Sequence, residues 1–515
     1  MFRKYFLKNL ANLGFGLAIV FFLAIIFLPA VFILSYFFKA KDFFTPEVIK
    51  AILASFEIGL LVTFINLVFG LPLAWLIARS KAKIVKILDN LIDLSLVVPT
   101  AALGFSIYLY WGSQYGLGRL FGLEAGLFSQ GPILIILLHV VFTLPYMIRS
   151  IAAAIVEIEP AYEQAALTLG ANRFTIFRSI SLPLFKDGII GGSILTFTRS
   201  LSETGATMMV AGLFATAPIL IVGFKQAGQM PQAAGVSIVM ILAAIIILFL
   251  SKLLLGQKSF KMERVYPKLE KSLLKLKTLK NIILGLFFVL IIFIPTIYII
   301  VFNLANLQLL FSSVLIKSLV VSFVLAFIVT IINLFFSAPI AYLIARNKFG
   351  LGYFLDSLNE VVLLVPTTAL GLSLVLFWQY FFTHEFIILI LAHLSFSFPL
   401  LVKPLIAAFK NIPVSLEEAA YSLGANKKQM FITILLPIIR PALIAGSIMA
   451  FMRSLSETGA TLAVAANIKT IPVLIVDFVN QNELGQAAFA SAILLIIAFI
   501  FLMILKSNKF SQNKF

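Results

Sequence analysis

Apolar residues in this chain of 515 residues gather in long runs, separated by short polar segments rich in lysine and arginine. A helix needs about 20 apolar residues to cross the roughly 30 Å hydrocarbon core of a bilayer, and the runs reach that length. The pattern therefore predicts an all-α polytopic membrane protein with about 12 transmembrane helices, six in each half of the chain. The predicted spans are residues 11–37, 51–78, 88–111, 132–149, 184–203, 233–254, 281–303, 313–345, 357–380, 386–406, 438–457 and 486–505.

The two halves are related by an internal repeat. Residues Phe197–Thr207 return as Phe451–Thr461 with ten of eleven residues identical, a displacement of 254. Further upstream the displacement is 267, as from Pro99 to Pro366, so the first half carries 267 − 254 = 13 extra residues, most simply in the glycine-rich stretch 112–122. We expect a first domain at 1–256, a basic linker at 257–280 and a second domain at 281–515. A duplicated membrane domain is typical of transporters whose pathway lies between the repeats.

Composition and charge agree with this class. The chain is 62% hydrophobic and only 12% charged, whereas soluble domains are about 25% charged. With the predicted spans, 30 of the 39 Lys and Arg residues fall on one side of the bundle. Positively charged loops mark the cytoplasmic side, so we expect both termini to be cytoplasmic. The net charge of +18 then follows from topology, and no nucleic-acid partner is needed to explain it.

A polar loop between the fourth and fifth spans of each half carries a repeated motif. Two alanines follow an acidic segment, a glycine comes four residues after the second alanine, and a proline lies thirteen residues beyond that glycine. Small alanines allow another surface to approach, glycine permits a left-handed turn, and proline suits the first turn of a helix. We expect a short helix–turn–helix on the cytoplasmic face that docks a partner. Its residues are Glu163, Gln164, Ala165, Ala166 and Gly170, and Glu417, Glu418, Ala419, Ala420 and Gly424.

Ionisable residues also recur inside the fifth span of each half. Arg199 and Glu203 are four residues apart, as are Arg453 and Glu457, so each pair shares a helix face. Charges at membrane depth face each other, the bundle interior or water. Two interpretations stay open: a gate or pore-lining element, or buried ion pairs that fix helix packing. The candidate pathway residues are Arg199, Ser202, Glu203, Thr207, Arg453, Ser456, Glu457 and Thr461.

Other features of the spans favour packing over chemistry. His139 and His393 lie in the fourth spans, where a packing role is the main interpretation and a metal-ligand or proton-relay role is the alternative. Pro99 and Pro366 predict kinked helices, which membrane proteins tolerate where neighbours satisfy the freed carbonyl. The sequence has no phosphate-binding Gly-x-x-x-x-Gly-Lys-Ser/Thr loop and no metal-ligand or catalytic constellation. We expect no catalytic residue, metal or cofactor in this chain.

The repeated loop resembles the EAA motif of ABC importer permeases, in which Glu-Ala-Ala is followed by Gly and then by Ile-x-Leu-Pro. The matching residues downstream are Ile180, Leu182 and Pro183, and Ile434, Leu436 and Pro437, while Gln164 departs from the family glutamate. The resemblance implies two fused MetI-like permease halves whose loops are coupling helices for two separate ATPase subunits. These would use ATP and Mg, and an extracytoplasmic substrate-binding protein would deliver the substrate. It also implies a multi-pass location in the bacterial inner membrane and no ATPase activity in the chain itself.

The segment from Arg199 to Thr207 is similar to an Arg-x-Leu-Gly-Glu-Phe-Gly-Ala-Thr stretch of sulfate and molybdate permeases. Ser202 and Thr204 replace its glycine and aromatic residue. This resemblance implies a small oxyanion as substrate. The fused layout is similar to ferric-iron and thiamine permeases, which stay as the alternative. An ion-coupled secondary transporter, also built from repeats, is the competing class of protein.

Overall fold

Helices make up the regular structure of the computed structural model, which describes residues 15–39, 44–124, 126–254, 277–303, 312–347 and 350–512. No strand occurs within these ranges. The predicted linker at 257–280 lies outside the described residues except for its last four, which begin helix α15 (Lys277–Phe288). The domain boundaries set at that linker stay a prediction.

Nine helices of the described ranges are long and apolar enough to cross a membrane, and up to eleven spans result if each of two bent helix pairs counts as one. This confirms the all-α polytopic membrane architecture, and each predicted span overlaps a described helix, with residues 11–14 of the first span lying outside the described residues. The first half contains Phe15–Tyr36, which includes α2 (Leu28–Phe32), α3 (Pro46–Arg79), α4 (Lys83–Val97), α5 (Thr100–Ile107), α6 (Pro132–Val156), α10 (Lys186–Ser202) and α13 (Met230–Leu254). The second half contains α15, α16 (Ile294–Asn303), α17 (Ser313–Arg346), α18 (Leu351–Leu364), α19 (Thr367–Trp378), α20 (Glu385–Lys410), α23 (Leu436–Leu455) and α26 (Leu484–Gln512).

Proline ends the helix within the third span of each half, whereas the sequence predicted only a kink there. Between α18 and α19 the chain bends by 112°. The residue before a proline is pushed out of the helical region, and proline has no N–H to continue the helix. Val365 accordingly has ψ 133° and Pro366 begins α19 as its N-terminal cap. Pro99 takes the same place before α5, so α5 and α19 are separate helices rather than continuations.

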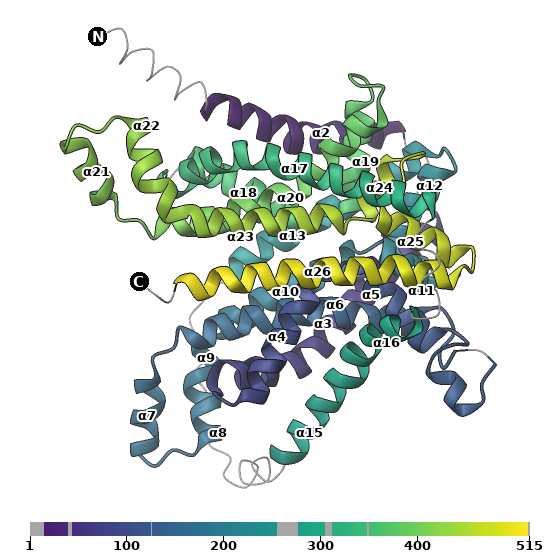
Figure 1. Ribbon diagram of the computed structural model, residues 1–515, viewed down its shortest axis with the longest axis horizontal. Helices are drawn as coiled ribbons and strands as arrows, with labels where there is room; N and C mark the ends of the chain where they lie inside the picture. Colours follow the sequence, from purple (N-terminus) through teal and green to yellow (C-terminus); the bar gives the residue numbers. More distant parts are fainter. Residues whose placement is uncertain are drawn as a thin grey trace.

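Short helices that no long apolar run indicates follow the fifth span of each half. They are α11 (Gly205–Ala211) and α12 (Ala217–Gln226), and α24 (Gly459–Val464) and α25 (Ile471–Asn480). Figure 1 places α12 and α25 at one end of the bundle, opposite α7 (Pro160–Thr168) and α21 (Val414–Ser422). The 13 extra residues are confirmed in the connection between the third and fourth spans. This connection has 19 residues in the first half, 113–131, and 6 residues in the second half, 379–384.

Each half covers the other with its first helix. Phe21 stacks on Phe336 of α17 with ring centroids 3.8 Å apart, and Phe287 of α15 stacks on Phe69 of α3 at the same distance. These two contacts are equivalent under the repeat, and both cross between the halves. The last helices cross as well, since α13 packs on α19 and α26 packs on α4 and α5. We call this arrangement the reciprocal exchange.

Buried amide–hydroxyl bonds tie neighbouring spans together within each half. Asn66 of α3 donates to the Thr143 hydroxyl of α6 at 2.6 Å. In the second half Asn333 of α17 donates to the Ser397 hydroxyl of α20 at 2.8 Å. Polar contacts of this kind hold membrane helices together where lipid supplies no hydrophobic driving force. The two halves therefore share this contact as well as the sequence pattern.

Candidate functional site

The repeated loop forms a short helix, a turn and a second helix in both halves, as the sequence predicts. Gly170 and Gly424 lie two residues after the ends of α7 and α21, and their φ angles are +84° and +86°. These left-handed conformations favour glycine. Both loops project from the same end of the bundle (Figure 1).

The second helix of each loop starts earlier than expected. It begins at Arg173 in α8 (Arg173–Ile176) and at Lys427 in α22 (Lys427–Met430). It does not begin at Pro183 or Pro437, the prolines that recur at the same spacing in both motifs. The Asn172 side chain accepts two backbone N–H bonds at the first of these ends, and Asn426 with Gln429 forms a capping box at the second. The prolines follow a π-helical turn further along, so asparagine rather than proline sets where the helix begins.

The loops present apolar side chains to solvent. Leu169 is 88% exposed and Leu423 is 89% exposed, each beside the turn glycine. Of the paired alanines, Ala165 and Ala419 are exposed whereas Ala166 and Ala420 are buried. Exposed apolar side chains in a cluster mark interaction surfaces. The leucines escaped the sequence analysis, although their position next to each repeated glycine is a signal that could have identified them.

The two leading glutamates of the motif face inward. The Glu163 carboxylate accepts hydrogen bonds from Arg79 Nη2 at 2.7 Å and from the Ser181 hydroxyl at 3.0 Å. Arg79 is the last residue of α3, so the bond ties the loop to the end of a membrane helix. Gln164 and Glu418, which follow the two glutamates, are exposed instead. Glu163 thus positions the loop, and the next residue faces outward.

The second loop is held more tightly. The Glu417 carboxylate accepts from the Tyr342 hydroxyl at 2.7 Å, from Arg346 Nε at 2.8 Å and from Arg346 Nη2. Its side chain is 6% exposed, compared with 20% for Glu163. Burial, together with the Glu417 carboxylate, raises the pKa of the nearby Tyr421 hydroxyl above its ordinary value. Arg79 and Arg346 are equivalent at the displacement of 267, and that recurrence was the available signal for this anchor.

The second candidate site lies where the two halves meet, at the breaks that separate α10 from α11 and α23 from α24. Arg199 Nη2 lies 3.9 Å from Glu203 Oε2, and Arg453 Nη1 forms a close ion pair with Glu457 Oε2. The backbone N–H groups of Ala206 and Ala460 donate to these carboxylates at 3.3 and 2.8 Å. The structure therefore brings the four predicted charges together, and we call these four residues the charge cluster. Ser202 and Ser456 donate to the carbonyl oxygens of Arg199 and Arg453 within their own helices.

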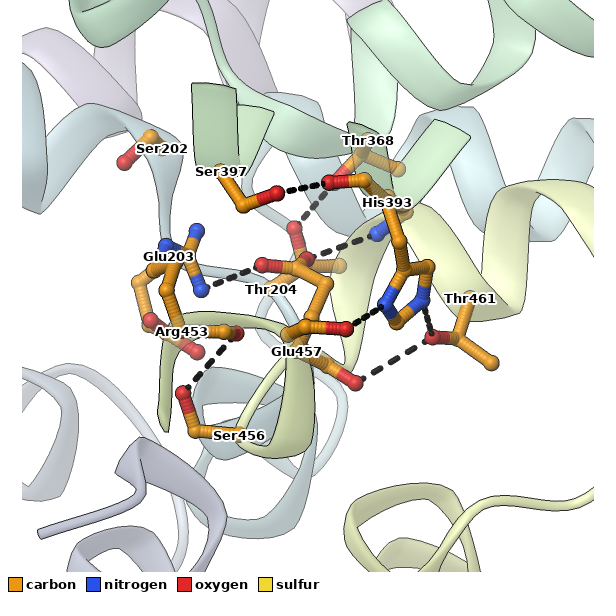
Figure 2. A network of polar contacts seen from close by, with 12 residues as sticks. Ser202, Glu203, Thr204, Thr368, His393, Ser397, Arg453, Ser456, Glu457 and Thr461 are labelled. Carbon is orange, nitrogen blue, oxygen red and sulfur yellow. Dashed lines mark hydrogen bonds and ion pairs between the residues drawn. The ribbon is translucent and has the colours of Figure 1, made fainter. Parts of the chain in front are cut away.

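Contacts at the charge cluster cross between the halves. Figure 2 shows Arg453 and Glu457 beside Glu203 and Thr204 of the first half. The hydroxyls of Thr204 and Thr368 are hydrogen-bonded across the interface. Gly205 lies so close to Thr458 that an added Cβ would come within 2.2 Å of the Thr458 side chain. Glycine is required here because the Thr458 side chain packs directly on the Gly205 backbone.

A buried histidine holds each break in place. His139 bonds to the Ser200 and Thr207 hydroxyls at 2.8 and 2.9 Å. His393 bonds to the Ser454 and Thr461 hydroxyls at 2.9 and 3.0 Å (Figure 2). Both ring nitrogens are used, so the contacts favour the packing interpretation of these histidines. Thr207 and Thr461 accordingly act as partners of the histidines within the break.

Known proteins resemble this chain in each half separately. The sequence model of the family described as binding-protein-dependent transport system inner membrane component matches residues 70–262 and again residues 337–508. Over 210 residues the chain is 32% identical to the sulfate transport system permease protein CysT of Salmonella typhimurium, covering 38% of this chain and 74% of that protein.

Two further relatives have similar coverage. The molybdenum transport system permease protein ModB of Escherichia coli is 36% identical over 163 residues, covering 31% of this chain and 70% of ModB. The molybdate/tungstate transport system permease protein WtpB of Methanocaldococcus jannaschii is 30% identical over 199 residues, covering 39% of this chain and 78% of WtpB. Because one half of this chain matches most of such a protein, two permease units are fused here. The chain belongs to the family of binding-protein-dependent transport system inner membrane components, the permease subunits of ABC importers.

Proposed function

We propose that this chain forms the translocation pathway of an ATP-driven importer for a small oxyanion of the sulfate or molybdate type. The observation that carries the proposal is the pair of coupling loops, which project from one end of a bundle whose two halves enclose the charge cluster. Two loops in one chain provide two docking points, as a dimer of ATPase subunits requires.

The partners follow from this arrangement. Two ATPase subunits bind the loops and use ATP and Mg, while this chain binds neither. An extracytoplasmic substrate-binding protein delivers the oxyanion at the opposite end, where α12 and α25 lie. The chain resides in the inner membrane with both termini in the cytoplasm, on the side of the coupling loops.

The docking residues divide into two groups. Exposed side chains contact the ATPase: Gln164, Ala165, Glu418, Ala419, Leu169 and Leu423. Buried side chains transmit its movement to the membrane helices, through Glu163 to α3 and through Glu417 to α17. Ala166, Ala420 and the turn glycines give the loop its shape.

The charge cluster supports an anionic substrate. Arginine offers five donors in a fixed plane that matches the oxygens of an oxyanion. Two arginines, one from each half, lie at the interface through which a substrate would pass. The substrates named for two of the relatives, sulfate for CysT and molybdate for WtpB, are tetrahedral oxyanions of this kind.

Uptake into proteoliposomes tests the proposal. The chain is purified with its ATPase subunits, reconstituted, and supplied with the substrate-binding protein and radiolabelled sulfate or molybdate. We expect uptake of one of the two ions that requires ATP hydrolysis and stops when a nonhydrolysable analogue replaces ATP. Uptake that continues without ATP and is abolished by a protonophore would instead identify an ion-coupled carrier and overturn the proposal.

A further inference from the structure

The carboxylate of Glu457 is held by the kinds of group that bind an oxyanion. The Arg453 guanidinium forms an ion pair with it, and the Ala460 backbone N–H donates to it at 2.8 Å. The Thr367 hydroxyl of α19, a helix that lies beyond the proline break, bonds to the same carboxylate. Guanidinium, backbone N–H and hydroxyl groups are also the donors with which proteins bind sulfate-like and phosphate-like ions. This is an anion site whose present occupant is a side chain of the protein itself.

Unused donors lie at the same place. Among the described residues, the Thr458 hydroxyl and the Nε of Arg199 are buried without a hydrogen-bond partner. Thr458 is only 2% exposed and directly follows Glu457. Arg199 interacts electrostatically with Glu457 as well as with its own Glu203. Buried donors without an acceptor are unfavourable, so both groups would gain from an anion with more oxygens than a carboxylate has.

The unpartnered hydroxyl has a cause in the sequence. Thr204, the equivalent of Thr458 in the first half, bonds to the Thr368 hydroxyl. The first-half residue equivalent to Thr368 at the displacement of 267 is Ala101, which has no hydroxyl. The repeat therefore loses a hydroxyl at this position, and the result is a free donor next to Glu457 in the chain.

We propose that Glu457 is a stand-in for the transported oxyanion: its carboxylate occupies the anion site in the substrate-free permease, and the passing oxyanion displaces it. The proposal rests on the function proposed above and deepens it by placing the anion at the break between α23 and α24. Glu203 has the equivalent place in the first half, but its contacts are longer, 3.9 Å to Arg199 and 3.3 Å to the Ala206 N–H. Glu457 is therefore the stronger competitor.

Direct binding to the purified permease tests the stand-in. The full chain is prepared with its ATPase subunits in nanodiscs, without the substrate-binding protein, and titrated with radiolabelled sulfate and molybdate. Glu457→Gln keeps the shape of the side chain but removes the competing charge. We expect it to bind one of the two ions about tenfold or more tightly than the unaltered permease does. Arg453→Gln in the same background should abolish that gain, and Glu483→Gln, an exposed glutamate of the same half outside both sites, serves as the matched control without a gain.

The outcomes separate this proposal from the proposed function. A Glu457→Gln permease that elutes as a single species, unfolds at the normal temperature and gains no affinity overturns the stand-in, as does a gain that survives Arg453→Gln. If Glu457→Gln fails to fold, Glu203→Gln takes its place with Arg199→Gln as its second variant, and the same results decide. ATP-driven uptake of either ion by the unaltered complex is measured in parallel. Uptake without a gain in binding overturns only the stand-in, and absence of both overturns the proposed function as well.

Discussion

Glu417→Gln should loosen the second coupling loop without disturbing the membrane bundle. The carboxylate now accepts one bond from Tyr342 and two from Arg346, and the amide offers a single oxygen and turns a donor toward these donors. Hydrogen bonds to charged groups contribute about 1.5–3 kcal/mol each, and breaking a buried ion pair costs about 3–5 kcal/mol. Since Arg346 keeps some solvent contact, we take about 3 kcal/mol as the loss in the free energy of local opening.

Hydrogen–deuterium exchange of peptides covering residues 414–424 measures this loss directly. A loss of about 3 kcal/mol corresponds to exchange about 100-fold faster in that loop. Glu163→Gln should accelerate exchange in the first loop only about fivefold, because its carboxylate is more exposed and accepts from one charged donor. ATP-driven uptake should fall more in Glu417→Gln than in Glu163→Gln.

The control is Glu418→Gln, which changes the same charge one residue away on the exposed face. It should leave the exchange of the loop unchanged. The reasoning is refuted if Glu417→Gln exchanges at the normal rate, or if Glu418→Gln loosens the loop as much as Glu417→Gln does.

Three further expectations concern the exposed ends of the bundle. Leu423→Asp should weaken binding of the ATPase subunits in a pull-down. The permease should still unfold at its normal temperature, because the leucine side chain is exposed. Normal binding by this variant would show that Leu423 is not part of the docking surface. Gly424→Ala should destabilise the same loop by about 1 kcal/mol, seen as faster exchange there, since its φ of +86° suits only glycine well. Leu213 lies just after α11 and is exposed, as is Leu169 in the first coupling loop at the other end of the bundle. A membrane-impermeant thiol reagent should label the Leu213→Cys variant in intact cells but not the Leu169→Cys variant, because the chain has no other cysteine. The reverse result would invert the topology.

Much of the fold could be predicted because a bilayer imposes helix length on an apolar sequence. Apolar runs of about 20 residues located the long membrane helices, and the change of displacement from 254 to 267 located the extra loop. The size of the proline breaks could not be predicted, because a proline shows that a helix is interrupted but not where the next segment packs. Helices α11 and α24 escaped notice since they are too short to leave an apolar run.

At the candidate sites, the spacing of the motifs identified the residues but not the directions in which their side chains point. The motif pointed to Glu163 and Glu417 as docking residues, and it did not show that their side chains turn toward Arg79 and Arg346 at the ends of α3 and α17. Spacing also placed Arg453 and Glu457 on one helix face, which the ion pair agrees with. The contact between Thr204 and Thr368 joins residues 164 positions apart, and no local pattern encodes such a pair.

The reciprocal exchange has a consequence for biogenesis. Phe21 leaves the ribosome 336 − 21 = 315 residues before Phe336, the residue on which it stacks. At a synthesis rate of about 5–20 residues per second, the first helix waits roughly 15–60 s in the membrane with its final partner not yet made. During that interval an exposed helix face is open to the insertion machinery, to lipid or to another nascent chain. Placing both halves in one polypeptide ensures that the awaited partner arrives at the same location and in equal number.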